Sequence, residues 1–457
     1  MTSAWTKRRL LKTTGLIASA AGLVPAQLLA AKSTSQWRNW GGNLSSQPQS
    51  ILVPRSEDQL VELLKSSTGT IRPVGSGHSW SSLVPTQGRL ISLDAMNGVV
   101  SHDSNSVQAD VWGGTKLFAL GPALESVDQA LLNMSDVNYQ SIAGAIATST
   151  HGTGASIGSM SSFVRGLRLV TANGETIDCD AEKNAEIFRA AQVSLGILGV
   201  NSRVRLQNQP AHRLHQREWL AETEDVLEDI DSFMHSNQQF ELFPLPHTSK
   251  SIVVITNPAI DSKSDTIVDR PEAVNDLRQA FELSRTLPIG GEFVYKKLLE
   301  LAYRSGSDRI GASYKVLAHP RVVPFMEMEY TVPAELGVQC LREVLSVIRK
   351  KAPDVAFPLE YRYVKADQSM LSMFSERDGC SISMHQFADS PDWQAYFETL
   401  EPVFRKYDGR PHWGKWNSMK EADFAALYPQ WNNFKRVRRE LDPSGTFLNS
   451  YLRSLFS

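Results

Sequence analysis

Two glycine-rich segments constrain the fold of this chain more than any other feature of its sequence. The first, Arg72 to Trp80, follows a short apolar run and places Gly75 and Gly77 on either side of a serine. The second, Ser141 to Gly154, combines glycines with small residues and hydroxyls. Glycine lets backbone amides turn toward a phosphate, so the two segments could embrace one dinucleotide. The first segment lacks the third glycine of a Rossmann fingerprint, which argues against that fold.

Strand-like and helix-like patterns alternate around these segments. Residues 71–74 predict a strand that enters the first segment, and the apolar spacing over 60–64, after a capping box, predicts a helix before it. Asn173-Gly174, between two alternating runs, predicts a hairpin with a type I′ turn. The composition turns more polar from about residue 209, which indicates a domain boundary. Residues 325–332 then predict a strand of a second sheet.

Composition and charge limit the classes of function. The 457 residues suffice for roughly two or three packed domains of an ordinary globular protein. A net charge of −2 leaves no electrostatic footprint for nucleic acid and suits a small neutral substrate. Cys179, Cys340 and Cys380 lack paired spacing, so we expect them in the core and not in disulfides or a zinc site. His212 and His215 have no further ligands arranged around them, and we expect no metal.

The N-terminus has the pattern of a signal peptide over residues 1–32. Basic residues between Lys7 and Lys12 precede nineteen uncharged residues, Thr13 to Ala31. The basic stretch resembles a twin-arginine export signal, although Lys7 stands where its first arginine belongs. We therefore expect an exported, periplasmic protein without a stable membrane span. The alternative is a short uncleaved anchor, which Pro25 and the modest hydrophobicity disfavour.

The order of the motifs resembles the vanillyl-alcohol-oxidase superfamily. Gly75 to Ser79 is followed at the matching distance by Ser141 to Gly144 and by Thr150 to Gly154. The branch of sugar-1,4-lactone oxidases and alditol oxidases is most similar. The likeness covers essentially the whole mature chain, loosely so over about 210–320, and its further motifs are Leu195 to Val200, Glu360-x-Arg362, His385, Pro411 to Lys415, and Leu441 to Asn449.

This resemblance implies an α+β fold with a split, two-subdomain FAD-binding domain of the PCMH type. Residues 36–208 would form its N-terminal part, and residues 412–457 would return to it. Residues 209–411 would form a substrate, or cap, domain with an antiparallel sheet. The active site would lie where the two domains meet.

The resemblance also implies FAD as the cofactor, bonded covalently through a ring nitrogen of His78 to the flavin 8α-methyl group. The alternative is a histidine that only forms hydrogen bonds in its loop. A second, cysteinyl link is not expected, because no cysteine lies between His78 and Cys179. His151 would belong to the pyrophosphate and ribityl cradle and would not act as acid or base. The other implied FAD contacts are Arg72, Gly75, Ser76, Gly77, Ser79, Ser135, Ser141, Gly144, Thr148, Ser149, Thr150, Gly152 and Val200.

Four side chains would carry the chemistry, which needs a proton acceptor and a positive charge near the flavin. Glu360 and Arg362 lie two apart, so on a strand they share a face and can hold adjacent sugar hydroxyls. An ordinary ion pair is the alternative. The resemblance makes His385 a proton acceptor or hydroxyl polariser, where a satisfied core histidine is the alternative. It makes Lys415 the cation that stabilises the reduced flavin anion.

Two departures from the family bear on substrate and acceptor. Ser135-Asp136 replaces the usual small residue and serine beside the flavin, and Asp136 is a further candidate site residue that could bind a hydroxyl, require a cationic group or cap a turn. Phe387 replaces a small polar residue of the alditol enzymes, which favours lactones. We expect oxidation of an aldono-1,4-lactone, with O2 or another electron acceptor. The alternatives are an alditol oxidase acting on a polyol and an exported flavin-binding protein without turnover.

Overall fold

A computed structural model describes residues 36–260, 264–269, 272–287, 289–303 and 306–457. These described residues belong to one unit. The signal peptide predicted over residues 1–32 lies outside the described residues. No helix among the described residues is long and apolar enough to cross a membrane.

A small parallel sheet carries the first glycine-rich segment. Its strands run in the order β3 (Ser50–Leu52), β5 (Arg89–Ser92) and β4 (Ile71–Val74). Helix α1 (Glu57–Ser66) connects β3 to β4, and it begins where the Ser56 side chain accepts a hydrogen bond from the Gln59 amide. Both the helix and the strand that the sequence predicted here are therefore confirmed.

A five-stranded antiparallel sheet follows in the order β10-β9-β11-β7-β6. The hairpin predicted at Asn173-Gly174 joins β9 to β10, but the predicted type I′ turn is wrong. Only Gly174 has a positive φ, of 78°, whereas a type I′ turn needs two such residues. The Gly174 amide donates to the Thr171 carbonyl, and within this turn only the glycine is in the left-handed conformation. The strands are β6 (Val99–Asp103), β7 (Gln108–Trp112), β9 (Val164–Val170), β10 (Thr176–Asp180) and β11 (Val200–Gln207).

Helices and short strands accompany these two sheets. Helix α3 (Ile142–Ala147) starts at Ser141, so the second glycine-rich segment begins as a helix cap. The remaining elements of this half are β1 (Trp37–Arg38), β2 (Ser45–Ser46), α2 (Leu117–Glu125), β8 (Gln129–Ala130), a 3-10 turn (Met160–Phe163), α4 (Ala185–Ala191) and β12 (Gln209–Pro210).

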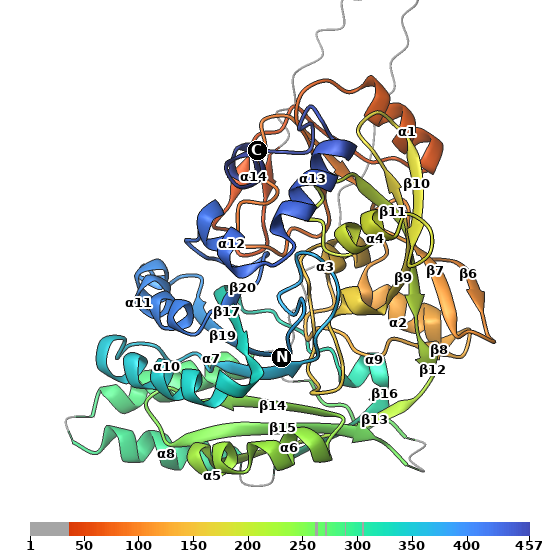
Figure 1. The fold of residues 1–457 in the computed structure, drawn as a ribbon. Coiled ribbons are helices and arrows are strands. Elements are labelled where there is room, and N and C mark those ends of the chain that lie inside the picture. The colour runs from red at the N-terminus through yellow and green to blue at the C-terminus, as the bar shows by residue number, and fades with distance from the viewer. Residues whose placement is uncertain (1–35, 261–263, 270–271, 288, 304–305) are drawn as a thin grey trace, which may run out of the picture. The chain divides into compact units, whose positions relative to one another are not determined.

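An eight-stranded antiparallel sheet dominates the second half, in the order β16-β13-β15-β14-β18-β19-β17-β20 (Figure 1). This confirms the predicted antiparallel sheet and the α+β class. The strands are β13 (Arg213–Glu222), β14 (Gln239–Pro244), β15 (Lys250–Pro258), β16 (Ser307–Ala312), β17 (Phe325–Pro333), β18 (Glu360–Val364), β19 (Gly379–Phe387) and β20 (Arg410–Pro411).

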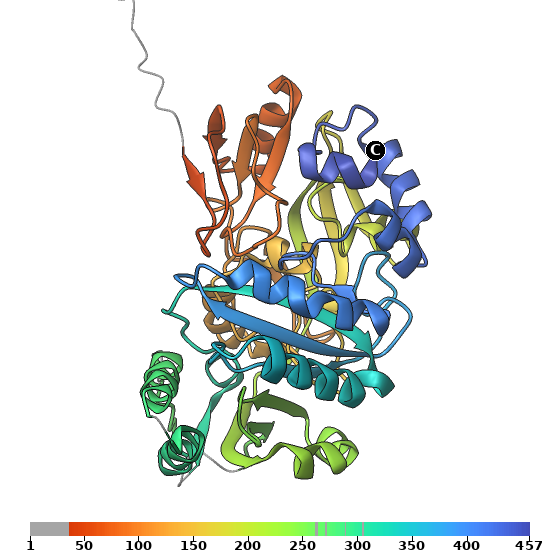
Figure 2. The same ribbon diagram turned by 90° about the vertical axis from the view of Figure 1, so that its left-hand side faces the viewer.

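Helices line this large sheet, and the two longest, α10 and α11, pack against β17 and β19 (Figure 2). Cys340 and Cys380 are buried at this contact and Cys179 is buried in β10, as predicted. The helices are α5 (Thr223–Glu228), α6 (Ile230–Ser236), α7 (Ala273–Arg285), α8 (Gly291–Ala302), α9 (Ser313–Val316), α10 (Gly337–Lys351) and α11 (Trp393–Lys406), with a 3-10 turn at Ala334–Leu336.

The C-terminal segment returns to the first sheets. It forms α12 (Glu421–Leu427), α13 (Trp431–Leu441) and α14 (Ser450–Phe456), and α13 packs against α4. The Ile71 amide of β4 donates to the Thr446 carbonyl. These contacts accord with a split domain, while the boundaries at 208 and 412 stay predictions.

Candidate active site

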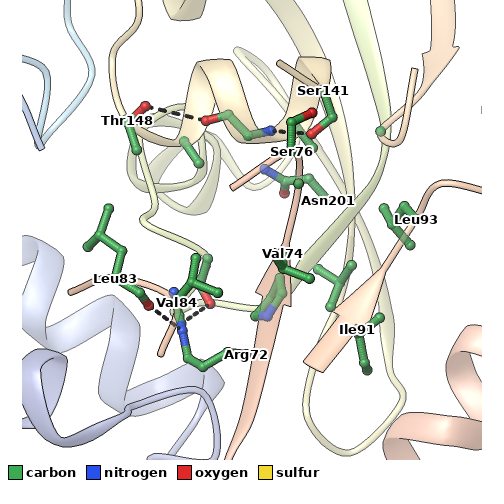
Figure 3. A pocket seen from close by; sticks show the side chains of 18 of the residues that line it. Arg72, Val74, Ser76, Leu83, Val84, Ile91, Leu93, Ser141, Thr148 and Asn201 are labelled. Carbon is green, nitrogen blue, oxygen red and sulfur yellow. Dashed lines mark hydrogen bonds between the residues drawn. The ribbon is translucent and has the colours of Figure 1, made fainter. Parts of the chain in front are cut away.

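The two glycine-rich segments line one cavity. Figure 3 views it with Ser76, Ser141 and Thr148 on one side and Arg72 with Leu83 on the other. Gly75 belongs there for a steric reason, because a Cβ at this position would lie 2.5 Å from the Ser141 hydroxyl oxygen. The predicted FAD residues on its wall are Arg72, Gly75, Ser76, Gly77, His78, Ser79, Ser141, Gly144, Thr148 and Val200.

Arg72 ties this cavity to distant parts of the chain. Its buried guanidinium donates to the carbonyls of Leu83, Leu195, Gly196 and Phe447, over distances of 2.7 to 2.9 Å. Burial lowers the pKa of Arg72 to about 9. Because these carbonyls engage most of its donors, the structure gives Arg72 a role in holding the cavity wall; its predicted contact with FAD stays a prediction.

His78 stands where this first cavity meets a second one, since it lines both. Its ring packs against Trp40, 4.5 Å between centroids, and Trp80, 5.3 Å away. Burial, and then Lys415, lower the pKa of His78 to about 4, so the ring is neutral near neutral pH. Its buried Nδ1 atom has no hydrogen-bond partner within the protein. An unpaired buried nitrogen at the junction of the cavities fits a bound cofactor.

The second cavity has a volume of about 450 Å³ and is lined in part by strands of the large sheet. Glu360, Arg362, His385 and Lys415 all line it, as does Asp136. The structure therefore brings together the side chains that the sequence proposed for catalysis. Among the predicted FAD residues, Ser135, Thr150 and His151 line this cavity.

Arg362 and Glu360 share one face of β18, as their spacing predicted. Arg362 Nη2 lies 3.3 Å from Glu360 Oε2, and Arg362 Nε lies 3.3 Å from Glu241 Oε1 on the adjacent strand β14. Burial opposes the charge, but Glu241 and then Glu360 raise the pKa of Arg362 above its ordinary value. Neither of these two nitrogens makes a well-directed hydrogen bond within the protein, so both can donate to a ligand oxygen.

A buried carboxylate joins His385 to Lys415. Glu327 of β17 lies directly opposite His385 of β19 in the sheet, with 3.5 Å between His385 Nε2 and Glu327 Oε1. Its other oxygen, Oε2, contacts Lys415 Nζ, which also lies 4.4 Å from the centre of the Trp80 ring. Burial favours the neutral acid, but Lys415 and His385 together lower the pKa of Glu327 to about 2. A fixed cation and an imidazole thus stand beside each other.

His151 is paired with a second carboxylate on β17. Its Nε2 lies 2.6 Å from Glu329 Oε1, and its Nδ1 lies 2.7 Å from the Gly152 carbonyl oxygen. Although burial opposes ionisation, His151 holds the pKa of Glu329 well below its ordinary value. The structure places His151 at the cavity with the catalytic candidates and not on the wall of the glycine-rich cavity. Its predicted place in the pyrophosphate and ribityl cradle stays a prediction.

Asp136 is neutralised by the chain itself. Its two carboxylate oxygens contact Nδ1 of His319 and Nη2 of Arg321, and its backbone carbonyl accepts from the His319 amide at 2.9 Å. Despite burial, Arg321 and His319 hold the pKa of Asp136 far below its ordinary value. Because Arg321 already supplies the counter-charge, the geometry does not favour a requirement for a cationic substrate. The Asp136 side chain does not cap a local turn either, because the residues that its carboxylate contacts are distant in the sequence.

Three predicted residues lie away from the cavity walls. Ser149 is fully buried, and its hydroxyl lies 3.1 Å from that of Ser372. Gly152 packs so closely that a Cβ would lie 2.3 Å from Asn133 Oδ1. Phe387 packs against Phe357, 5.0 Å between ring centroids, and Phe357 lines the cavity in its place.

Sequence reasoning missed the carboxylates Glu241, Glu327 and Glu329. A signal for two of them was present, because residues 326–330 alternate apolar and acidic residues within a predicted strand. Two acids on one face of a buried strand need partners, which marks them as site candidates. No cluster of histidine, cysteine and acidic residues suited to a metal was found among the described residues.

Comparisons with known proteins agree with this architecture. A family model described as D-arabinono-1,4-lactone oxidase matches residues 204–455, and an FAD binding domain matches residues 48–180. L-gulono-1,4-lactone dehydrogenase from Mycobacterium tuberculosis is 36% identical over 427 residues, covering 91% of this chain and 98% of that protein. L-gulonolactone oxidase from Bos taurus is 29% identical, covering 92% and 98%.

Solved structures show the same fold at low sequence identity. Cholesterol oxidase from B. sterolicum superimposes with a TM-score of 0.76 at 16% identity, covering 96% of this chain and 100% of that one. At this identity the likeness concerns the fold alone. The family match and the relatives confirm the resemblance drawn from the motifs. The chain belongs to the D-arabinono-1,4-lactone oxidase family of FAD-dependent oxidoreductases.

Proposed function

We propose that this protein oxidises a hydroxyl-bearing carbon of an aldono-1,4-lactone. The two relatives described above are named for gulonolactones, and the matching family model is described as D-arabinono-1,4-lactone oxidase. The observation that carries the proposal is the meeting of two cavities at His78, one lined by glycines and the other by Glu360, Arg362, His385 and Lys415. A nucleotide in the first cavity would thus place its reactive ring beside the second.

The residues of the second cavity suit the polar demands of this reaction. When bound, FAD accepts the hydride that leaves the carbinol carbon. Arg362 donates to substrate oxygens through the two nitrogens that are ion-paired but make no well-directed hydrogen bond within the protein, while Glu360 accepts from a neighbouring hydroxyl. His385 takes the proton of the reacting hydroxyl at a ring nitrogen released from one of its two contacts, Nδ1 with the Pro358 carbonyl at 3.3 Å or Nε2 with Glu327 at 3.5 Å. Lys415 keeps a positive charge at the cofactor end of the cavity.

The same geometry supports covalent attachment through His78. A neutral ring with an unpaired Nδ1 is a competent nucleophile, and the surrounding tryptophans hold it in one orientation. His78 would hold the cofactor through a bond from its ring to the 8α carbon. Overall the imidazole would lose its single N–H proton and the methyl group one proton, and the two electrons released would pass to the electron acceptor. Acid precipitation tests it: yellow colour must stay with the pellet of the native protein and move to the supernatant in His78→Ala.

Export is a separate proposal that rests on the N-terminal pattern alone. A cofactor inserted during folding gives a physical reason for a signal that exports folded proteins. Cell fractionation followed by N-terminal sequencing tests it. A periplasmic form that starts after residue 32 is expected, and an intact N-terminus in the membrane fraction would support the uncleaved anchor.

An anaerobic screen tests the main proposal. We expect an aldonolactone to bleach the flavin absorbance at about 450 nm faster than alditols or aldoses do, and admission of oxygen then separates an oxidase from an enzyme that needs another acceptor. Lys415→Met is expected to slow this reduction far more than it weakens FAD retention. Lys350→Met, at an exposed position of α10, is the matched control. Flavin that no sugar derivative bleaches would favour a binding protein without turnover.

A further inference from the structure

Glu327 occupies a central place in the second cavity although no motif pointed to it. Its side chain is only 5% exposed and comes from β17, the strand that pairs with β19 in register over its whole length. Each carboxylate oxygen faces a different partner, His385 on one side and Lys415 on the other. A single buried group therefore links the two residues to which the proposed function gives the proton and the positive charge.

Strand β17 also fixes the backbone around Lys415. The Trp416 amide donates to the Glu327 carbonyl at 3.0 Å, and the His412 amide donates to the Glu329 carbonyl at 3.0 Å. The segment 412–416 is thus hydrogen-bonded to the strand on both sides of Lys415. The backbone hydrogen bonds fix the position of the Lys415 main chain, and the Glu327 carboxylate fixes the position of its ammonium group.

Both oxygens of Glu327 are committed to these partners, which argues against direct binding of substrate. An ionised carboxylate that loses a partner in a buried site is costly, so the three groups have one mutually satisfied arrangement. Long lysine side chains otherwise have many rotamers. Other charged or titratable groups near Lys415 are His78, Glu329 and His412, of which only Glu329 carries a negative charge, and Glu329 is paired with His151.

We propose that Glu327 is a positioning residue of the oxidation site, which holds the ammonium group of Lys415 and the ring of His385 in the places where they act on substrate and cofactor. This inference rests on the proposed function for the roles of the two partners. It adds a residue whose effect passes through Lys415. A displacement of about 1 Å at such a site lowers the rate about 100-fold.

A double-mutant cycle tests the link. Glu327→Gln, Lys415→Met and the double variant are compared with the unchanged protein by the limiting rate of anaerobic flavin reduction at saturating lactone. Glu327→Gln is expected to lower this rate about 10- to 100-fold, with a smaller change in the lactone concentration that gives half the limiting rate. The double variant is expected to match Lys415→Met alone. The proposal would be overturned if the fold-changes of the two single variants multiplied in the double variant. An unchanged rate in Glu327→Gln would also overturn it.

The flavin midpoint potential gives a second reading that needs no sugar. Measured against redox dyes in the same four proteins, the shift caused by Glu327→Gln is expected to vanish when Lys415 is already methionine. Independent shifts would contradict the inference. If no lactone reduces the native protein but the potentials are coupled, the proposed function fails while the link between Glu327 and Lys415 stands.

Glu401→Gln is the matched control for loss of a buried carboxylate. Glu401 of α11 contacts the hydroxyl of Tyr330, also on β17, but lines neither cavity. This variant is expected to lower the thermal midpoint and to leave the rate and potential unchanged. Should Glu327→Gln fail to fold, Glu327→Asp keeps the charge but shortens the reach, and a native rate and potential in that variant would equally refute the positioning role.

Discussion

Replacing His412 with asparagine should make the stability of the protein less sensitive to mild acid. His412 is buried, and its Nδ1 atom accepts a hydrogen bond from the Gly414 amide at 3.0 Å. Burial is the main cause that lowers the pKa of His412 to about 4 from the ordinary value of 6.5. As the pH falls, His412 is protonated near 6.5 in the unfolded chain, whereas in the folded protein it stays neutral until the pH reaches about 4. Stability from this group is therefore complete above 6.5 and is lost on the way down to about 4.

The size of the effect follows from the pKa difference. Each pH unit in this window costs about 1.4 kcal/mol, so at about pH 5 the native protein has lost about 2 kcal/mol of its unfolding free energy through His412. His412→Asn keeps an acceptor for the Gly414 amide and removes the titration.

Urea unfolding at about pH 7 and about pH 5 measures the difference. The loss of unfolding free energy between the two pH values should be smaller in His412→Asn than in the native protein by about 2 kcal/mol. His102→Asn changes an exposed histidine in the same way and should keep the native dependence. An unchanged pH dependence in His412→Asn would refute the reasoning, because it would mean that the folded protein protonates His412 as readily as the unfolded chain.

Three further predictions follow from buried contacts. Gly75→Ala should weaken FAD retention, seen as a lower flavin-to-protein absorbance ratio, because its Cβ would meet the Ser141 hydroxyl at 2.5 Å. Gly166→Ala is the comparison, because a Cβ there would make only ordinary contacts, the nearest at 3.6 Å. Arg72→Met should lower the unfolding free energy by about 3 kcal/mol or more, since four carbonyls lose their donor. The three cysteines should react with a thiol reagent only after unfolding. Burial raises the pKa of Cys179 and Cys340 to about 12 and that of Cys380 well above 9.0. Fast reaction in the native state would contradict their burial.

Local features were predictable because their causes are local. Helix α1 follows from a serine cap and one apolar face, and strand β4 ends where glycine begins. The hairpin at Asn173-Gly174 was predicted correctly, but its turn type was not. A glycine can take a positive φ in several turns, so the dipeptide indicates a reversal more firmly than it indicates the conformation of the residue before it.

The roles of buried ionic groups depend on contacts between distant residues. The family resemblance implies that Arg72 contacts FAD, yet one of its partners is 375 positions away in the C-terminal segment. His151 reads as part of a glycine-rich cradle, yet its carboxylate lies 178 positions away on β17. Nothing near either residue in the sequence signals these partners. Motif order could therefore gather the site residues into one region without stating which of them hold each other.

Strand β17 illustrates where the limit falls. The alternation of Met326, Glu327, Met328 and Glu329 fixes that both acids share one face. It leaves open whether that face meets solvent or a cavity, and a shift of pairing by one residue would move Glu327 away from His385. The register of β17 with β19 decides the matter, since it sets Glu327 opposite His385 and Glu329 opposite Ser383. Two acids alternating in such a strand therefore predict a shared face but not its burial. Their partners come from elsewhere in the fold: His385 from the neighbouring strand, and Lys415 and His151 from loops distant in the sequence.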